Sequence, residues 1–312
     1  MCLLFKWTVA ERGRRPLERF ELFSPTSVQE ALALYQEHRE AGCMYISGGT
    51  DLVPSMRKGA LHPAVLIDLQ PVGMDSIRLT ADGTEIGAAC TMKKLCSNKL
   101  IRSLWHALYL AAGSVGCTQT RGLATVGGNL CSGLPSMDTA PALLVYDAVL
   151  EIASASGFRR VGVEDFFVGP RKTCLRPGEI LTKLLLPDRE EHRKAHFIKF
   201  GRRNTLTLSI VNEAVGAVIR KNCLHQAHVA VGACAPTPVR IHGLEEYLEG
   251  RIAEEIEEQT VRELVAREIR PIDDFRASAE YRAALAGALV CKSLRVITGR
   301  SDPEDIVIGG RE

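Results

Sequence analysis

Two pairs of adjacent glycines are the residues in this 312-residue chain whose type and spacing could support binding chemistry. Gly48-Gly49 lies within residues 46–52, and Gly127-Gly128 lies within residues 123–141. Adjacent glycines lack two Cβ atoms and tolerate positive φ, so backbone N–H groups can turn toward an anion and surround it. Two such loops, each preceded by an apolar segment, are what a diphosphate-bearing cofactor would need. A single glycine pair is more often an ordinary turn or helix cap, and that alternative stays open for each loop by itself.

Signatures of other catalytic classes are missing from the sequence. Neither glycine loop has the G-x-G-x-x-G or G-x-x-x-x-G-K-[ST] pattern, and no H-E-x-x-H or G-x-S-x-G is present. The ten cysteines form no C-x-x-C pair and the eight histidines are dispersed, so we expect reduced thiols and no metal site. No residue is predicted to act as a catalytic acid, base or nucleophile.

The composition is that of an ordinary globular protein, with 46% hydrophobic and 24% charged residues. A net charge of +2 gives no reason to expect nucleic acid or a membrane surface as a partner. No apolar run approaches the ~18 residues of a membrane span, and the N-terminal apolar run is too short for a convincing signal peptide. We therefore expect a cytoplasmic protein.

The elements that position the two loops follow from the hydrophobic pattern. Residues 1–75 predict a β-α-β-α-β unit, with the first glycine loop between a strand at 44–47 and a helical turn at 52–58. Residues 76–190 predict an antiparallel-rich unit: a hairpin around Asp82-Gly83, helices at 92–97 and 101–113, and strands ending at 180–186.

A charged connector at 188–194 is the predicted domain boundary. The following sequence predicts three strands and then helices, at 195–201, 215–220, 227–235, 243–248, 252–269 and 279–298. The predicted class is α+β, with domains at 1–190 (subdomains at about 1–75 and 76–190) and 191–312.

Taken together, these segments resemble the FAD-binding medium subunit of the molybdenum hydroxylases, the group of xanthine dehydrogenase, carbon monoxide dehydrogenase and 4-hydroxybenzoyl-CoA reductase. The resemblance covers nearly the whole chain, and the order and separation of the segments match. It rests on residues 46–52, residues 125–130 with Asp138 and Pro141, residues 179–181 ahead of Pro187, and Lys199 with Arg202. It implies a two-subdomain FAD-binding domain of the vanillyl-alcohol-oxidase (PCMH) type, followed by a three-stranded antiparallel sheet with helices.

The resemblance also implies an FAD molecule extended between the two subdomains. Residues 47–52 would hold the diphosphate, with Thr125 to Asn129 on its other side. Asp138 would lie toward the ribose or adenine end, and Lys199 would lie near the flavin carbonyls. The full set of implied cofactor contacts is Tyr45, Ile46, Ser47, Gly48, Gly49, Thr50, Asp51, Leu52, Val115, Gly116, Thr120, Ala124, Thr125, Gly127, Gly128, Asn129, Cys131, Asp138, Leu181 and Lys199.

Several of these residues have plainer alternatives. Asp138 could cap a helix that begins near Pro141, and Asn129 could bond its own backbone. Lys199 could be a solvated strand residue, and Cys131 is interpreted as a packing residue.

The function implied by the resemblance is electron transfer. A molybdopterin-containing large subunit and a [2Fe–2S] small subunit would complete a heterotrimer, and FAD would exchange electrons with NAD or a protein carrier. The chain lacks the cysteine-rich insertion that carries a [4Fe–4S] cluster in hydroxybenzoyl-CoA reductase. It also departs from the family at Arg121-Gly122 and at residues 204–206. Two alternatives are a stand-alone flavin oxidoreductase of the same fold and a cofactor-free interaction subunit.

Overall fold

The computed structural model describes residues 17–187, 193–203 and 206–302. Its first unit is a parallel three-stranded sheet of order β1-β3-β2, with a helix begun by the Ser27 side chain, which accepts a hydrogen bond from the Glu30 N–H. A small core of Ala31, Leu32 and Ile67 closes this unit. Its elements are β1 (Glu21–Phe23), α1 (Val28–Glu37), η1 (Arg39–Ala41), β2 (Cys43–Ile46), α2 (Leu52–Arg57) and β3 (Val65–Asp68).

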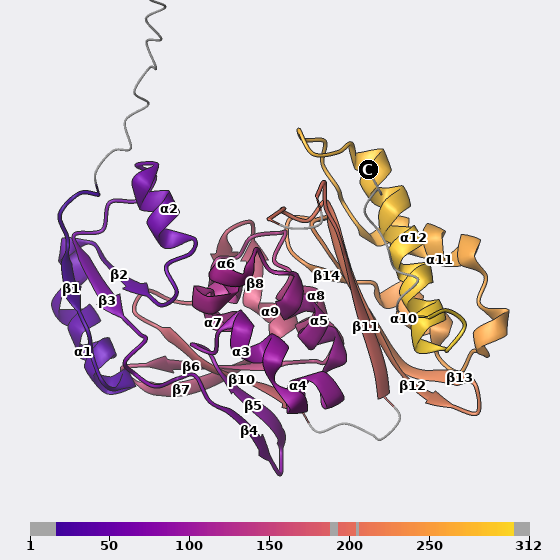
Figure 1. Ribbon diagram of the computed structural model, residues 1–312, viewed down its shortest axis with the longest axis horizontal. Coiled ribbons are helices and arrows are strands. Elements are labelled where there is room, and N and C mark those ends of the chain that lie inside the picture. The colour runs from indigo at the N-terminus through magenta and orange to yellow at the C-terminus, as the bar shows by residue number, and fades with distance from the viewer. Residues whose placement is uncertain (1–16, 188–192, 204–205, 303–312) are drawn as a thin grey trace, which may run out of the picture.

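The second unit is an antiparallel five-stranded sheet of order β4-β5-β10-β6-β7, beside which helices α3 to α8 gather (Figure 1). Its strands are β4 (Ile77–Thr80), β5 (Gly83–Gly87), β6 (Val149–Ser154), β7 (Gly157–Gly162) and β10 (Ile180–Pro187), with a side hairpin of β8 (Phe167–Gly169) and β9 (Lys172–Thr173). Its helices are α3 (Met92–Ser97), α4 (Lys99–Leu104), α5 (His106–Ser114), α6 (Thr118–Leu123), α7 (Val126–Cys131), α8 (Thr139–Val145) and α9 (Val163–Phe166).

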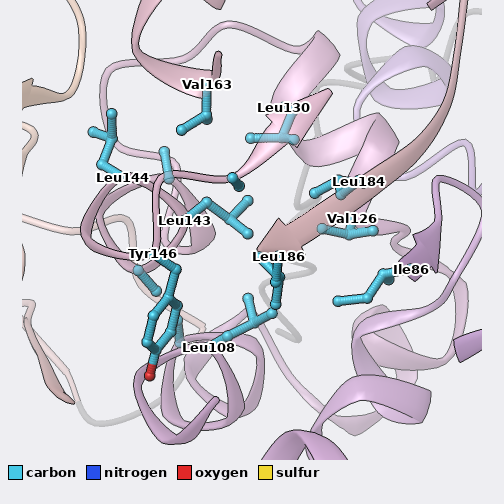
Figure 2. Packing of buried hydrophobic residues seen from close by; sticks show 14 of the residues in the cluster. Ile86, Leu108, Val126, Leu130, Leu143, Leu144, Tyr146, Val163, Leu184 and Leu186 are labelled. Carbon is cyan, nitrogen blue, oxygen red and sulfur yellow. The ribbon is translucent and has the colours of Figure 1, made fainter. Parts of the chain in front are cut away.

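The core of this unit holds the second glycine loop in place. Figure 2 shows Val126 and Leu130 of α7 among Leu184, Leu186 and Ile86 of the sheet, and the two α7 side chains have no exposed surface. Burying two such side chains contributes several kcal/mol, at about 1.5–3 kcal/mol each. The short helix that contains Gly127 and Gly128 is therefore anchored to the five-stranded sheet by Val126 and Leu130.

The single helix predicted at 101–113 is wrong, because two helices meet at Trp105. The Trp105 indole N–H donates to the Thr84 hydroxyl at 2.9 Å, and its ring packs edge-on against Tyr146 at 4.9 Å. A buried indole needs a hydrogen-bond partner, so tertiary contacts override the local helical pattern here.

The C-terminal unit is an antiparallel four-stranded sheet of order β11-β12-β13-β14, rather than the three strands predicted. The additional strand has only two residues, which is too short for an alternating pattern to reveal it. The elements are β11 (Arg193–Phe200), β12 (Val211–Arg220), β13 (Cys223–Gly232), β14 (Val239–Arg240), α10 (His242–Leu248), η2 (Ala253–Glu255), α11 (Glu258–Glu268) and α12 (Ala279–Ile297).

This sheet lies between two helical layers (Figure 1). One face carries Phe197, Ala214 and Ala230, which pack into the core shared with α5 and α8. The other face packs against α10, α11 and α12. The predicted connector at 188–194 cannot be compared in full, since residues 188–192 lie outside the described residues. No helix in the described part of the chain is long and apolar enough to cross a membrane.

Candidate functional site

The first glycine loop touches the second stretch directly. It follows β2, where the Ile46 carbonyl accepts a hydrogen bond from the Leu69 N–H at 2.8 Å. Gly49 has φ +66°, which only glycine adopts at low cost. At Gly48, a Cβ atom would stand 1.9 Å from the carbonyl oxygen of Leu123. Gly48 is therefore required for the close approach of the two backbones.

The two glycines of the second loop face opposite sides. The Gly127 N–H donates to the Ala88 carbonyl at 2.8 Å, and a Cβ at Gly127 would stand 2.7 Å from the same oxygen. Gly128 is exposed, and a Cβ there would meet only the Thr125 hydroxyl, at 2.8 Å. That hydroxyl caps α7 by accepting the Gly128 N–H at 3.1 Å. Gly127 is thus required for close packing against Ala88, whereas Gly128 is exposed and leaves room for the Thr125 hydroxyl that caps the helix.

A cavity of about 180 Å³ lies between the β2 loop, α7 and β10. Seven of the predicted cofactor contacts line it: Tyr45, Ile46, Ser47, Gly127, Gly128, Cys131 and Leu181. Seven other lining residues were not predicted: Leu69, Met74, Ala88, Ala89, Leu175, Glu179 and Ile180. Glu179 and Ile180 directly precede a predicted contact, so the sequence offered a signal for them. The remaining five reach the cavity only through the topology of the sheets.

The cavity wall is largely apolar, and the polar side chains in its lining include those of Tyr45 and Glu179. Its described lining contains no lysine or arginine. The Tyr45 hydroxyl donates to the Gly178 carbonyl at 3.1 Å, and burial raises the pKa of this phenol, so it stays neutral. Glu179 is held by Arg159 at 2.7 Å, and this hydrogen bond lowers the pKa of the carboxyl group. The N–H groups of Gly127 and Gly128 already donate to Ala88 and Thr125. An anionic diphosphate would therefore be held here by backbone N–H groups of the loop at residues 47–52 rather than by cations.

A second set of predicted residues lies where β11 and β12 pack against α8. The Lys199 ammonium donates to Asp138 Oδ2 at 2.5 Å and to the Ser114 carbonyl at 3.1 Å. Asp138 Oδ1 accepts from Ser209 at 2.6 Å and from Asn212 at 3.0 Å. Asp138 is buried, and only 11% of the Lys199 side chain is exposed.

This geometry excludes the plainer alternatives for three residues. Asp138 precedes α8, but its side chain makes no capping hydrogen bond. Lys199 is not solvated, because it is paired and almost buried. Asn129 does not bond its own backbone through Oδ1, which accepts from the Thr139 hydroxyl at 2.5 Å.

The geometry also corrects the placement of Asp138 relative to Lys199. The resemblance implies opposite ends of an extended cofactor for the two: the ribose or adenine end for Asp138 and the flavin carbonyls for Lys199. Their ion pair at 2.5 Å means that the two side chains lie together and cannot contact opposite ends. The physical reason is that β11 and β12 bring Lys199 onto the start of α8, which the sequence order alone does not reveal.

The other predicted residues support these two regions without lining the cavity. Val115 and Gly116 directly follow Ser114, and a Cβ at Gly116 would stand 2.9 Å from Thr120, so these three form a tight corner near Lys199. Four others lie around the contact between the two loops. Ala124 is buried against Gly48, Thr50 and Asp51 are exposed, and Leu52 begins α2.

Comparisons with known proteins cover nearly the whole described chain. A family described as "FAD binding domain in molybdopterin dehydrogenase" matches residues 18–189, and "CO dehydrogenase flavoprotein C-terminal domain" matches residues 196–297. The xanthine dehydrogenase FAD-binding subunit of Escherichia coli O157:H7 is 29% identical over 269 residues, covering 85% of this chain and 91% of that protein. The nicotinate dehydrogenase FAD-subunit of Eubacterium barkeri is 32% identical over 199 residues, covering 62% of this chain and 67% of that protein.

A solved structure confirms the predicted fold. One chain of carbon monoxide dehydrogenase from Hydrogenophaga pseudoflava superimposes with a TM-score of 0.86 at 25% identity, covering 91% of this chain and 99% of that chain. The two-part α+β architecture is therefore shared over almost the full length of both proteins.

Proposed function

This chain belongs to the family of FAD-binding subunits of molybdopterin dehydrogenases, and we propose that it carries electrons between an iron–sulfur subunit and an external carrier. Its cofactor is FAD, as in the relatives named FAD-binding subunits. The observation that supports the proposal most strongly is the meeting of the two glycine loops at one cavity. Substrate chemistry would take place on a separate molybdenum-containing large subunit, and NAD is one candidate carrier.

The residues of the cavity fit the diphosphate and adenosine portion of FAD. Gly128 is exposed, lines the cavity and has no side chain, so a phosphate can approach the backbone there. Tyr45 and Leu181 provide apolar surface beside these loops. FAD, when bound, supplies reversible electron transfer, and the protein contributes binding, placement and electrostatics.

The flavin ring would then extend toward Lys199 and Asp138. A lysine ammonium has three donors, and two of those on Lys199 are used by Asp138 and the Ser114 carbonyl. The third can donate to a flavin carbonyl oxygen. A cation at this position favours negative charge on the reduced ring, so Lys199 would assist reduction without transferring a proton.

The proposal is tested by replacing Gly128 in the chain purified with its partner subunits. Gly128→Val places a branched side chain on the exposed surface of the loop and against the Thr125 hydroxyl, so we expect loss of FAD while the complex stays assembled. Gly162→Val is the matched control, because Gly162 has φ −61° and a Cβ there would only reach Asp165 Oδ2 at 3.7 Å. FAD content is measured from flavin absorbance after denaturation. Equal FAD content in both variants would overturn the loop assignment.

The same preparation separates the two alternatives. A stand-alone flavin oxidoreductase would reduce its FAD with an organic substrate in the absence of the partner subunits. A cofactor-free interaction subunit would show no flavin absorbance after incubation with excess FAD. The nine free cysteines of the described residues accord with a reducing, cytoplasmic location, which is part of the proposal.

A further inference from the structure

Two polar residues of the C-terminal unit have no role in the function described so far. Ser209 and Asn212 are fully buried, and both donate to the same oxygen of Asp138. We infer that Ser209 and Asn212 are positioning residues that hold Asp138 and thereby set the redox potential of FAD. This inference rests on the proposed function, in which Lys199 lies beside the flavin.

The Asp138 carboxylate is divided between two sets of partners. Oδ2 accepts from Lys199 at 2.5 Å, whereas Oδ1 accepts from Ser209 at 2.6 Å and from Asn212 at 3.0 Å. A buried carboxylate needs several such donors to remain charged. Ser209 and Asn212 therefore compensate part of the negative charge that would otherwise act on Lys199 alone.

The Asn212 amide is oriented at a cost. Its Nδ2 donates to Asp138 and to the Met137 carbonyl at 3.0 Å. Its Oδ1 is buried and has no hydrogen-bond partner among the described residues. An unsatisfied buried carbonyl is uncommon and calls for an explanation. Here the amide gives up one hydrogen bond in order to present its N–H groups to the carboxylate.

The surrounding chain leaves room for this orientation. A Cβ at Gly232, on the neighbouring strand β13, would stand 2.1 Å from Asn212 Oδ1. Glycine at this position therefore permits the amide to point its oxygen toward β13 and its nitrogen toward Asp138. Lys199 pairs with Asn212 across β11 and β12, so two of the three side-chain partners of the carboxylate come from one strand pair.

The direction of the effect follows from electrostatics. If Ser209 or Asn212 loses its donor, the carboxylate interacts more strongly with Lys199 and neutralises it further. The positive potential at the flavin then falls, and the reduced, more negative ring is less stabilised. Hydrogen bonds to charged groups are stronger than neutral ones, and we expect roughly a tenfold shift toward oxidised FAD for each donor lost. For a two-electron couple this is about 30 mV toward a more negative midpoint potential.

The test measures the FAD midpoint potential of the intact complex by reductive titration against reference dyes. Ser209→Ala removes one donor, and Asn212→Ser is a second variant in case the first does not fold. Ser209→Thr keeps the hydroxyl and should restore the potential. Ser293→Ala is the matched control, since Ser293 is equally buried and donates to Glu213 instead of Asp138.

The expected result is a more negative potential in Ser209→Ala and Asn212→Ser, with FAD still bound, and unchanged values in Ser209→Thr and Ser293→Ala. Bound FAD with an unchanged potential in both donor variants would overturn this inference alone. An equal shift in Ser293→Ala would also overturn it, because the effect would then reflect general loosening. A wild-type complex without FAD would instead overturn the proposed function on which it rests.

Discussion

Replacement by alanine should affect a different property at each of the two adjacent glycines of the second loop: protein stability at Gly127 and FAD binding at Gly128. In Gly127→Ala the new methyl group would stand 2.6 Å from the Ala88 Cβ and 2.7 Å from the Ala88 carbonyl oxygen. Overpacking of this kind costs about 1–3 kcal/mol. The hydrogen bond from the Gly127 N–H to Ala88 would also be stretched, at about 0.5–1.5 kcal/mol. Alanine in place of glycine within helix α7 gains about 1 kcal/mol, so we expect a net loss of about 0.5–3.5 kcal/mol in the free energy of unfolding.

In Gly128→Ala two effects nearly cancel in the protein without cofactor. The methyl group would stand 2.8 Å from the Thr125 hydroxyl and would displace the helix cap, which costs about 1 kcal/mol. Alanine in place of glycine within a helix gains about 1 kcal/mol. The stability of the FAD-free protein should therefore change by less than about 1 kcal/mol, while FAD binding weakens.

The assay compares urea unfolding of the FAD-free proteins with the dissociation constant for added FAD, followed by flavin fluorescence. Gly127→Ala should show its main effect on unfolding, and Gly128→Ala its main effect on FAD binding. The reasoning would be refuted if Gly127→Ala were as stable as the wild type. It would equally be refuted if Gly128→Ala bound FAD with unchanged affinity.

Three further changes should have measurable effects. Burial raises the pKa of Glu213 well above its ordinary value, so the folded protein keeps this proton while the unfolded chain loses it as the pH rises. The free energy of unfolding should therefore decline above pH 5 by up to about 1.4 kcal/mol per pH unit, and Glu213→Gln should flatten this decline. Asp274→Asn should cost about 3 kcal/mol in urea unfolding, because the fully buried Arg282 loses its carboxylate partner at 2.7 Å. Gly232→Ala should cost about 1–3 kcal/mol, measured as a fall in melting temperature, and Asn212→Ala in the same chain should recover part of it.

Each of these changes has a control or an opposing outcome. A wild-type stability that is constant between pH 5 and pH 9 would contradict the protonated state of Glu213. Asp75→Asn removes an ion pair with Lys94 in which both side chains are about half exposed, and it should cost less than about 1 kcal/mol. Additive losses in Gly232→Ala with Asn212→Ala would mean that the two residues do not interact.

Much of the fold could be predicted because local signals agree with the tertiary structure. The hairpin around Asp82-Gly83 forms as expected between β4 and β5. Thr91 begins α3 by accepting the Lys94 N–H, as a threonine before an apolar period predicts. The turn between β12 and β13 is made by Lys221 and Asn222, both with positive φ, which favours a tight hairpin.

The rest depended on contacts that no local pattern contains. The break at Trp105 arises from a hydrogen bond to Thr84, which lies 21 residues earlier. The glycine loops could be identified as a pair from the sequence. The different roles of Gly127 and Gly128 could not be predicted, because they depend on which of the two glycines faces Ala88. Asp138 and Lys199 are 61 residues apart in the chain, and they pair only because the second unit packs against the C-terminal unit.

The contact between Gly48 and Leu123 has a consequence for how this chain can vary among its relatives. The atoms that exclude a side chain at position 48 belong to the backbone of Leu123, which every amino acid possesses. No replacement at position 123 can therefore make room for a larger residue at position 48. We expect glycine at position 48 to be retained across the family. The residue type at position 123 should vary, because the Leu123 side chain is exposed to solvent.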